Sequence, residues 1–384
     1  MGYGGGGPGG GGPGGSGGSG GSGGGSGYRT VGGGSAFGGS DDFELPSLNQ
    51  APAGSIRFNT DSNKLEVYIL SPVGYGTLPN GIWMEVDSWS PDLMTGGTRG
   101  VFSGGNPSTD VMDYINIATT GNAISFGTLS AARLSLGATS DRTRGIVVGG
   151  YTSGGSNVDI IEFFTFASTG SRADFEDLTF ARRYCTGSSN GTRGLISGGY
   201  TSNYVEEIQY VTIQAAAEAV DFGNLITAAT DRVAVCNSTR TVIGGGETAP
   251  GKINNIEYVM TATLGNGADF GDLVTARRGC GGSCNSTRGI WMGGDAPADT
   301  NHIDYIEFAT LGNAIDFGNL SSSCGRHQGH VSSPTRGICA GGFPNSNEIQ
   351  YIQLMSKGDS VDFGNLTRNA SDENAGASNG HGGL

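Results

Sequence analysis

Cysteine and histidine offer the widest chemistry in this chain, because they ligate metals, form disulfides and act as nucleophiles. The chain has six cysteines and four histidines. Cys280 and Cys284 lie four residues apart on a predicted strand, so they share a face about 13 Å apart and cannot bond to each other. Cys185 and Cys280 precede a recurring Thr-Arg pair by seven residues, and Cys236 and Cys284 precede it by three. We therefore interpret the cysteines as small buried side chains and expect neither a disulfide nor a zinc framework.

The histidines give a similar prediction. His327 and His330 have a spacing that could supply half of a metal site. The remaining two, His302 and His381, give no third ligand at a fixed spacing. We expect no catalytic residue, no metal ligand and no cofactor.

An Asp-Phe-Gly triplet occurs four times and could be taken for the metal-binding triplet of protein kinases. A kinase carries that triplet once, together with a lysine strand and a catalytic loop. We predict instead that it forms a structural turn after a strand. The triplets begin at Asp221, Asp269, Asp316 and Asp362.

A repeat of roughly 48 residues accounts for these recurrences and must position any functional side chain. Each copy opens with Thr-Arg, continues to a Gly-Gly pair and an aromatic residue, and reaches a Phe twelve residues beyond that aromatic. The Thr residues are Thr98, Thr143, Thr192, Thr239, Thr287 and Thr335, and the Phe residues are Phe126, Phe175, Phe222, Phe270, Phe317 and Phe363. A unit of this length cannot bury its own apolar faces, so the copies are expected to stack on one another.

Each copy predicts four short strands. In one copy these are 278–284, 289–292, 303–308 and 314–317. The second strand is apolar on consecutive residues, as in Ile146-Val147-Val148, which indicates burial on both faces. Small four-stranded sheets stacked face to face around an axis form a β-propeller. A segment after the last copy, residues 370–378, has no copy of its own, and we expect it to complete the first sheet.

The sequence therefore predicts an all-β, six-bladed β-propeller over residues 91–384. A small β module over residues 41–90 and a Gly/Ser/Pro-rich tail over residues 1–40 precede it. Within the module, residues 54–59 and 64–68 predict a hairpin, residues 82–86 a third strand, and Trp83 and Trp89 the apolar anchors.

Loop lengths indicate where binding residues lie. The distance between the Gly-Gly pair and the following aromatic varies from nine to thirteen residues, whereas the next hairpin keeps its spacing. The variable loops emerge from one end of the propeller, where recognition residues are expected. The candidate binding residues on these loops are Asn106, Tyr151, Tyr200, Tyr204, Lys252, Asp295, His302, Phe343 and Asn345.

Charge and hydropathy exclude several partners. The net charge is −14, and the basic residues form no cluster, which argues against a nucleic-acid partner. No apolar run approaches the ~20 residues that span a bilayer. We expect no membrane insertion and no cleavable secretory signal.

Three resemblances follow from these motifs. Gly-Gly after an apolar strand, a later aromatic and an Arg such as Arg182 or Arg277 opening the next unit resemble kelch-type propeller repeats. The sequence motif Thr-Leu-Gly-Asn-Ala-Ile-Asp-Phe-Gly-Asn-Leu resembles repeats of virion structural or tail-fibre-like proteins of marine tailed phages. The Gly-Ser-Ile-Arg-Phe-Asn-Thr pattern near residue 54 is similar to a short module of phage tail fibres.

These resemblances imply a non-enzymatic virion protein that is made in the host cytoplasm and carried on the extracellular particle. Its N-terminal region would attach to other virion proteins, in many copies or as a homo-oligomer. The propeller would bind a host surface glycan or protein, or a neighbouring virion protein. One alternative is a purely structural decoration or fibre-packing subunit. Another is an extracellular carbohydrate-active enzyme, which would need convergent carboxylates or a metal cluster in one set of loops.

Overall fold

In the computed structural model, residues 54–59, 64–69, 82–85, 98–170, 172–322, 329–343, 346–368 and 373–384 are described. The chain divides into two compact units, Met1–Ser88 and Trp89–Leu384. The tail over residues 1–40 and Trp89 lie outside the described residues.

The N-terminal unit contains one antiparallel three-stranded sheet, as the sequence predicts. Its strands are β1 (Ile56–Asn59), β2 (Lys64–Ile69) and β3 (Ile82–Glu85), in that order across the sheet. Tyr68 is buried and packs edge-on against Trp83, with ring centroids 5.2 Å apart. The Arg57 guanidinium lies 4.3 Å from the centroid of the same indole. An aromatic pair with a stacked cation is therefore the anchor of this small sheet.

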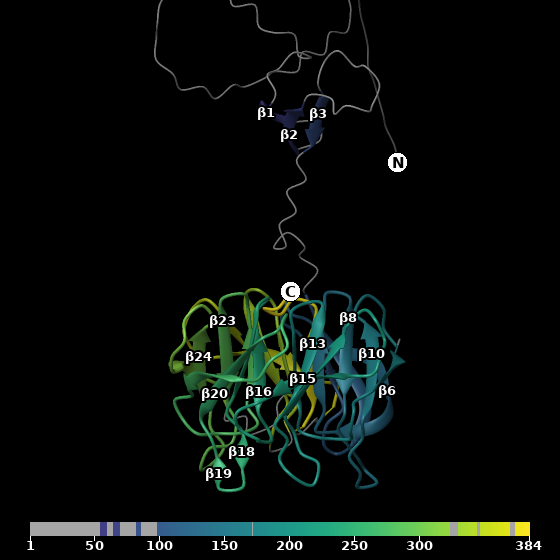
Figure 1. The fold of residues 1–384 in the computed structure, drawn as a ribbon, viewed down its shortest axis with the longest axis vertical. Helices are drawn as coiled ribbons and strands as arrows, with labels where there is room; N and C mark the ends of the chain where they lie inside the picture. The colour runs from purple at the N-terminus through teal and green to yellow at the C-terminus, as the bar shows by residue number, and fades with distance from the viewer. Residues whose placement is uncertain are drawn as a thin grey trace, which may run out of the picture. The chain divides into compact units, whose positions relative to one another are not determined.

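The second unit is all-β and consists of six antiparallel sheets in a ring, a six-bladed β-propeller (Figure 1). Blade 1 contains β30 (Ala375–Ser378), β4 (Arg99–Ser103), β5 (Thr109–Asn116) and β6 (Ile124–Leu134), extended by β9 (Tyr151–Thr152). Blade 2 contains β7 (Gly137–Ser140), β8 (Arg144–Val148), β10 (Ile160–Thr165) and β11 (Arg172–Asp177). Blade 3 contains β12 (Thr186–Ser189), β13 (Arg193–Ser197), β14 (Glu207–Thr212) and β15 (Val220–Asn224).

The other three blades repeat the pattern. Blade 4 contains β16 (Val233–Cys236), β17 (Arg240–Gly244), β20 (Asn255–Met260) and β21 (Ala268–Asp272), with a small hairpin of β18 (Glu247–Thr248) and β19 (Gly251–Lys252) in its loop. Blade 5 contains β22 (Gly281–Cys284), β23 (Arg288–Met292), β24 (His302–Glu307) and β25 (Ile315–Asn319). Blade 6 contains β26 (Gly329–Ser332), β27 (Arg336–Ala340), β28 (Glu348–Gln353) and β29 (Val361–Asn365).

The last strand of the chain closes the ring, which confirms the prediction. β30 pairs antiparallel with β4, and Ala375 lies opposite Ser103 while Ser378 lies opposite Gly100. The turn that follows the innermost strand is also preserved across this junction. The Asn379 side chain accepts a hydrogen bond from the Arg99 amide at 2.9 Å, as the Asn285 side chain does from the Arg288 amide at 2.8 Å in blade 5. The two ends of the propeller domain therefore complete one blade, and β30 covers the edge that β4 would otherwise expose.

Six apolar clusters fill the six interfaces between blades. In blade 2, Val147 packs with Val101 and Phe126 of blade 1, whereas its neighbours Ile146 and Val148 pack with Ile196 of blade 3. Successive residues of the second strand thus face opposite interfaces, because side chains alternate across a sheet. The prediction that this strand is buried on both faces is confirmed.

The recurring Arg and the two recurring aromatics form one motif in every blade. Each Arg lies over the ring of its strand-three aromatic, 4.3 to 5.1 Å from the centroid, and that ring packs edge-on against the recurring Phe. The Arg residues are Arg99, Arg144, Arg193, Arg240, Arg288 and Arg336. Each also donates a hydrogen bond to a backbone carbonyl of the next blade; Arg336 of blade 6, for example, donates to Ile117 of blade 1 at 3.0 Å. The recurring Arg residues therefore connect each blade to the next through hydrogen bonds.

The Asp-Phe-Gly triplets lie within the outermost strand, at a β-bulge, and not in a turn after it as predicted. In blade 4, Gly271 has a φ of +150°, and the register of β20 against β21 shifts opposite it. The adjacent Phe270 carbonyl accepts a hydrogen bond from Gly312 of blade 5 at 2.8 Å. Glu176 takes the glycine's place in blade 2 and keeps a positive φ of +129°. The triplet is a contact between blades.

Substitution of two glycines that have similar backbone angles distinguishes the steric cost of this contact from the conformational strain that a positive φ imposes on alanine. A Cβ at Gly271 would lie 2.4 Å from the Gly312 carbonyl oxygen, whereas at Gly265, with a φ of +158°, nothing lies within 4 Å. We expect Gly265→Ala to lower the free energy of unfolding by about 1–2 kcal/mol and Gly271→Ala by about 2 kcal/mol more. Urea denaturation of both variants measures the difference, and equal losses would contradict the proposed contact.

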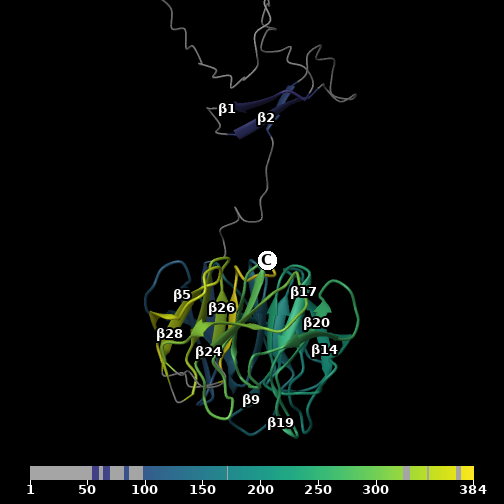
Figure 2. The ribbon, with the colours of Figure 1, turned by 90° about the vertical axis from the view of Figure 1, so that its left-hand side faces the viewer.

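The propeller has two unlike ends. One end carries the turns between the first and second strands, the hairpins between the third and fourth strands, and the C-terminus. The opposite end carries the loops between the second and third strands, including the β18–β19 hairpin, and the connections between blades (Figures 1 and 2). We call these ends the hairpin face and the loop face.

Candidate functional site: the loop face

The residue directly after each Gly-Gly pair occupies one ring of equivalent positions on the loop face. These residues are Asn106, Tyr151, Tyr200, Glu247, Asp295 and Phe343. The second strand ends at the glycine pair, whose positive φ angles turn the chain outward; in blade 3 these angles are +62° and +112°. Five of the six residues are among the predicted binding residues, so the structure places them at matching positions around one axis.

Short backbone pairings hold several of these loops as narrow hairpins. Tyr151 pairs with Asn157, Tyr200 with Tyr204 and Asp295 with Asp299, each as an antiparallel bridge. In blade 4 the same role falls to β18 and β19, where Glu247 lies opposite Lys252. A paired loop base limits the conformations of the loop, which reduces the entropy lost when the loop binds a partner.

An aromatic cluster forms where the loops of blades 2 and 3 meet. The Arg183 guanidinium lies 4.3 Å from the ring centroid of Tyr151, 5.4 Å from that of Tyr200 and 5.3 Å from that of Tyr184. Tyr204 packs edge-on against Tyr200 with centroids 5.7 Å apart. All five side chains are half-buried.

Backbone hydrogen bonds and one side chain fix the two loops to each other. Arg183 and Tyr200 exchange backbone hydrogen bonds of 3.1 and 2.8 Å. The Asn157 side chain donates to the carbonyls of Tyr200 and Thr201 at 3.3 and 3.1 Å. Three of the predicted residues, Tyr151, Tyr200 and Tyr204, are thus brought together on a rigid base.

Ion pairs occupy the equivalent place between blades 4 and 5. Arg278 holds the repeat position of Arg183 and contacts the carboxylates of Glu247 and Asp295, and Lys252 Nζ lies 2.6 Å from the second Asp295 oxygen. Burial alone would raise the pKa of Asp295. The positive charges of Lys252 and Arg278 lower this pKa by a larger amount, so the net shift is downward. Lys252 and Asp295, both of which are predicted binding residues, therefore neutralise each other. Their charges are already paired within the protein.

A second ring lines the loop-face mouth of the axial channel, and it has an unusual backbone. Ser135, Tyr184, Asp231, Gly279 and Glu373 are equivalent residues, and all have φ between +55° and +70°. Left-handed residues other than glycine are uncommon and often accompany functional sites. Neighbouring members are hydrogen-bonded through the backbone, for example Gly279 N–H to the Asp231 carbonyl at 3.0 Å.

The acidic groups at this mouth are engaged by other side chains. The Tyr184 hydroxyl donates to Glu373 at 3.0 Å, and Arg278 lies 3.7 Å from Asp231. Burial, followed by the charges of Glu373 and Asp231, raises the pKa of Tyr184, so its hydroxyl stays neutral. The cavity below them measures about 70 Å³, which suits water molecules and not a sugar ring. The cavity at the channel mouth is therefore too small for a ligand of ordinary size.

The remaining predicted residues lie away from the aromatic cluster. Asn106 is exposed in the loop of blade 1, and Phe343 is 38% exposed in blade 6. His302 is exposed at the start of β24, and its carbonyl accepts hydrogen bonds from Gly293 and Arg277. Asn345 and His327 lie outside the described residues.

Sequence reasoning missed the arginines of the connections and a group of possible metal ligands. Arg183 and Arg278 lie nine residues before Thr192 and Thr287, and this shared spacing is the signal that could have identified them. Within the described residues, the possible metal ligands that come together are Cys236, Cys284 and His381.

No helix in the part of the chain that the structure describes is long and apolar enough to cross a membrane. Comparison with models of known families and with curated proteins finds no match for this chain.

Proposed function

We propose that this protein is a non-enzymatic binding protein that recognises its ligand through the loop face. The observation that carries the proposal is the cluster of Tyr151, Tyr184, Tyr200 and Tyr204 around Arg183. Half-buried tyrosines offer rigid apolar faces for sugar rings or apolar side chains, and their hydroxyls supply hydrogen bonds. The ligand class that fits this combination best is a surface carbohydrate, with a protein surface as the other possibility.

The proposed setting is a virion. The sequence motifs of the repeats support this setting, because they resemble kelch repeats and phage tail-fibre repeats. The glycine-rich tail and the β1–β3 sheet support it too, since we expect them to attach the chain to other virion proteins. In this setting the hairpin face and the N-terminal region serve assembly, and the loop face meets the host surface. The engaged carboxylates at the channel mouth support binding in preference to catalysis.

Binding to an array of bacterial surface glycans tests the proposal directly. We expect the full chain to bind at least one glycan, and the double variant Tyr200→Ala/Tyr204→Ala to bind it at least about 30-fold more weakly. The expected loss is the effect of removing two central aromatic contacts, each contributing about 1–2 kcal/mol.

An exposed apolar residue on the hairpin face supplies the matched control. Leu311 is 56% exposed in the hairpin between β24 and β25, and Leu311→Ala should leave the affinity unchanged. Circular dichroism confirms that each variant is folded. A bound glycan whose affinity is unaffected in the tyrosine variant, or hydrolysed glycan in the reaction mixture, would contradict the proposed function.

A further inference from the structure

The last residues of the innermost strands form a ring at the hairpin-face end of the axis. Its members are Ser140, Ser189, Cys236, Cys284, Ser332 and Ser378. Three of the four serines donate a hydrogen bond to a carbonyl of a neighbouring blade. Ser140 Oγ donates to Ser378 and Ser378 Oγ to Ser332, both at 2.8 Å, and Ser189 Oγ donates to Ser140. Serine therefore fits this position in four blades, and the shape of the ring does not require cysteine. Two adjacent blades nevertheless carry cysteine.

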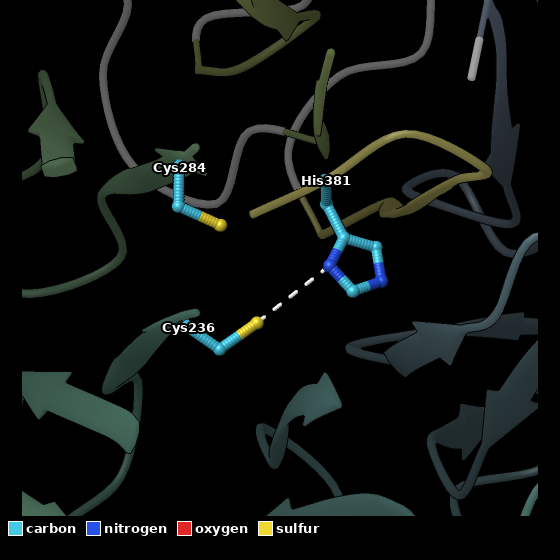
Figure 3. A group of neighbouring side chains, drawn as sticks. All are labelled: Cys236, Cys284 and His381. Atoms are coloured by element: carbon cyan, nitrogen blue, oxygen red, sulfur yellow. Dashed lines mark hydrogen bonds between the residues drawn. The ribbon is translucent and has the colours of Figure 1, made fainter. Parts of the chain in front are cut away.

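The residues after β30 cross this ring and bring one imidazole to the two cysteines. His381 follows the strand that completes blade 1, whereas Cys236 and Cys284 end the innermost strands of blades 4 and 5, across the axis. His381 Nδ1 lies 3.7 Å from Cys236 Sγ, and the three ligating atoms lie within 4.8 Å of one another. Figure 3 shows the three side chains pointing toward one another.

Hydrogen bonds orient the imidazole for coordination. Nε2 lies 3.0 Å from the Ser140 carbonyl oxygen, which accepts hydrogen bonds only, so Nε2 carries the proton. Nδ1 is then the unprotonated nitrogen, and it faces the thiols. A carbonyl that fixes the remote nitrogen of a ligating histidine is a regular feature of metal sites. The Gly383 amide donates to Nδ1 at 3.1 Å, and a metal ion would replace this donor at the end of the chain.

We propose that Cys236, Cys284 and His381 bind one Zn²⁺ ion that ties the C-terminal tail across the propeller axis. Ligand atoms of a tetrahedral zinc site lie about 3.5–3.8 Å apart, given bonds of about 2.3 Å to sulfur and 2.0 Å to nitrogen. The observed 3.7 Å matches this spacing, and the wider separation within the group requires a closure of about 1 Å.

The charge of the group suits its burial. Both thiols release a proton on binding, so Zn²⁺ with two thiolates and a neutral imidazole carries no net charge. A neutral complex avoids most of the cost of burying an ion. With three protein ligands, water completes the tetrahedron. The ion would link blades 4 and 5 to the tail that follows β30, and it would stabilise the closed ring because only the folded chain assembles the three ligands.

Zinc titration of the full chain tests the site. Protein reduced, freed of metal by chelation and titrated with Zn²⁺ should bind one ion per chain, measured by elemental mass spectrometry. Co²⁺ in place of Zn²⁺ should produce thiolate-to-cobalt charge-transfer absorption and the visible bands of tetrahedral cobalt. Zinc loading should raise Tm by at least about 5 °C.

The double variant Cys236→Ser/Cys284→Ser places in both blades the residue that four other blades already have, so we expect it to fold. It should lose the cobalt charge-transfer band and bind zinc at least about 100-fold more weakly. His381→Ala should weaken zinc comparably, whereas Cys280→Ala, which removes a buried cysteine at the other repeat position, should retain one zinc per chain.

Three results would overturn the proposal. The first is failure of the reduced wild-type chain to bind zinc stoichiometrically. The second is unchanged zinc affinity in the cysteine double variant. The third is a Cys236–Cys284 disulfide in the isolated protein together with no zinc uptake after its reduction.

Discussion

Deletion of residues 373–384 is expected to prevent the propeller from closing and to lower its free energy of unfolding by at least about 5 kcal/mol, a loss that few single changes reach. These residues contain β30, which supplies the innermost strand of blade 1. Without β30, β4 has an unpaired edge. The apolar residues Val101 and Phe102, which are fully buried in the intact protein, would become partly exposed. An exposed apolar edge also pairs readily with other chains.

A shorter deletion isolates the effect of the strand. Removal of residues 381–384 leaves β30 and the Asn379 bond to Arg99 in place. We expect this variant to lose only about 1–3 kcal/mol and to remain monodisperse. Thermal unfolding followed by circular dichroism, with sedimentation velocity for association, distinguishes the two. Equal stability of both deletions would show that β30 does not hold the ring together.

Asp304→Ala is expected to lower the free energy of unfolding by about 3–5 kcal/mol, because it removes one partner of a buried ion pair. Arg277 Nη2 lies 2.9 Å from Asp304 Oδ2, and the two side chains are 0% and 2% exposed. The same carboxylate accepts the Val274 amide at 3.2 Å. The substitution would therefore leave a buried cation without its counter-charge and a backbone donor without its acceptor.

Blade 3 has a neutral residue at the position equivalent to Asp304 and shows which hydrogen bonds such a residue can keep. Arg182 is fully buried there, its guanidinium donates to the carbonyls of Gly198, Ile196 and Glu207, and Gln209 stands where blade 5 has Asp304. The Gln209 side-chain oxygen still accepts a backbone amide, that of Thr179, at 3.2 Å.

Asp304→Asn keeps that acceptor, so we expect it to cost about 1–2 kcal/mol, well below Asp304→Ala. Chemical denaturation of both variants measures the difference. A loss below about 1 kcal/mol for Asp304→Ala would show that the buried pair contributes little to the fold.

The architecture was predictable because the repeat carries it. The spacing of Thr-Arg, Gly-Gly, aromatic and Phe reflects contacts that each copy makes with the next, so the four-stranded blades and the closing strand could be predicted from it. The place of Asp-Phe-Gly could not, because the bulge at Gly271 depends on the backbone of a neighbouring blade.

The candidate site was predictable only in part. The variable loops and Tyr151, Tyr200 and Tyr204 could be selected from loop length and residue type. Arg183 lies in a connection between blades, and its contact with the tyrosines arises only when two loops are folded side by side.

The group of Cys236, Cys284 and His381 was missed for a related reason. Spacing along the chain compares residues within one copy, whereas these three come together across the axis, from two strands and the end of the chain. The equivalent repeat positions of the two cysteines, combined with the predicted closure, contained the necessary signal.

The most direct test of the loop face as the binding surface is hydrogen–deuterium exchange of the full chain, with and without a glycan retained on the array. We predict slower exchange in residues 151–158 and 200–205, which carry the tyrosine cluster, and no change in the hairpin-face segments 118–123 and 309–314. Protection confined to those hairpins, with the loop segments unaffected, would contradict the account.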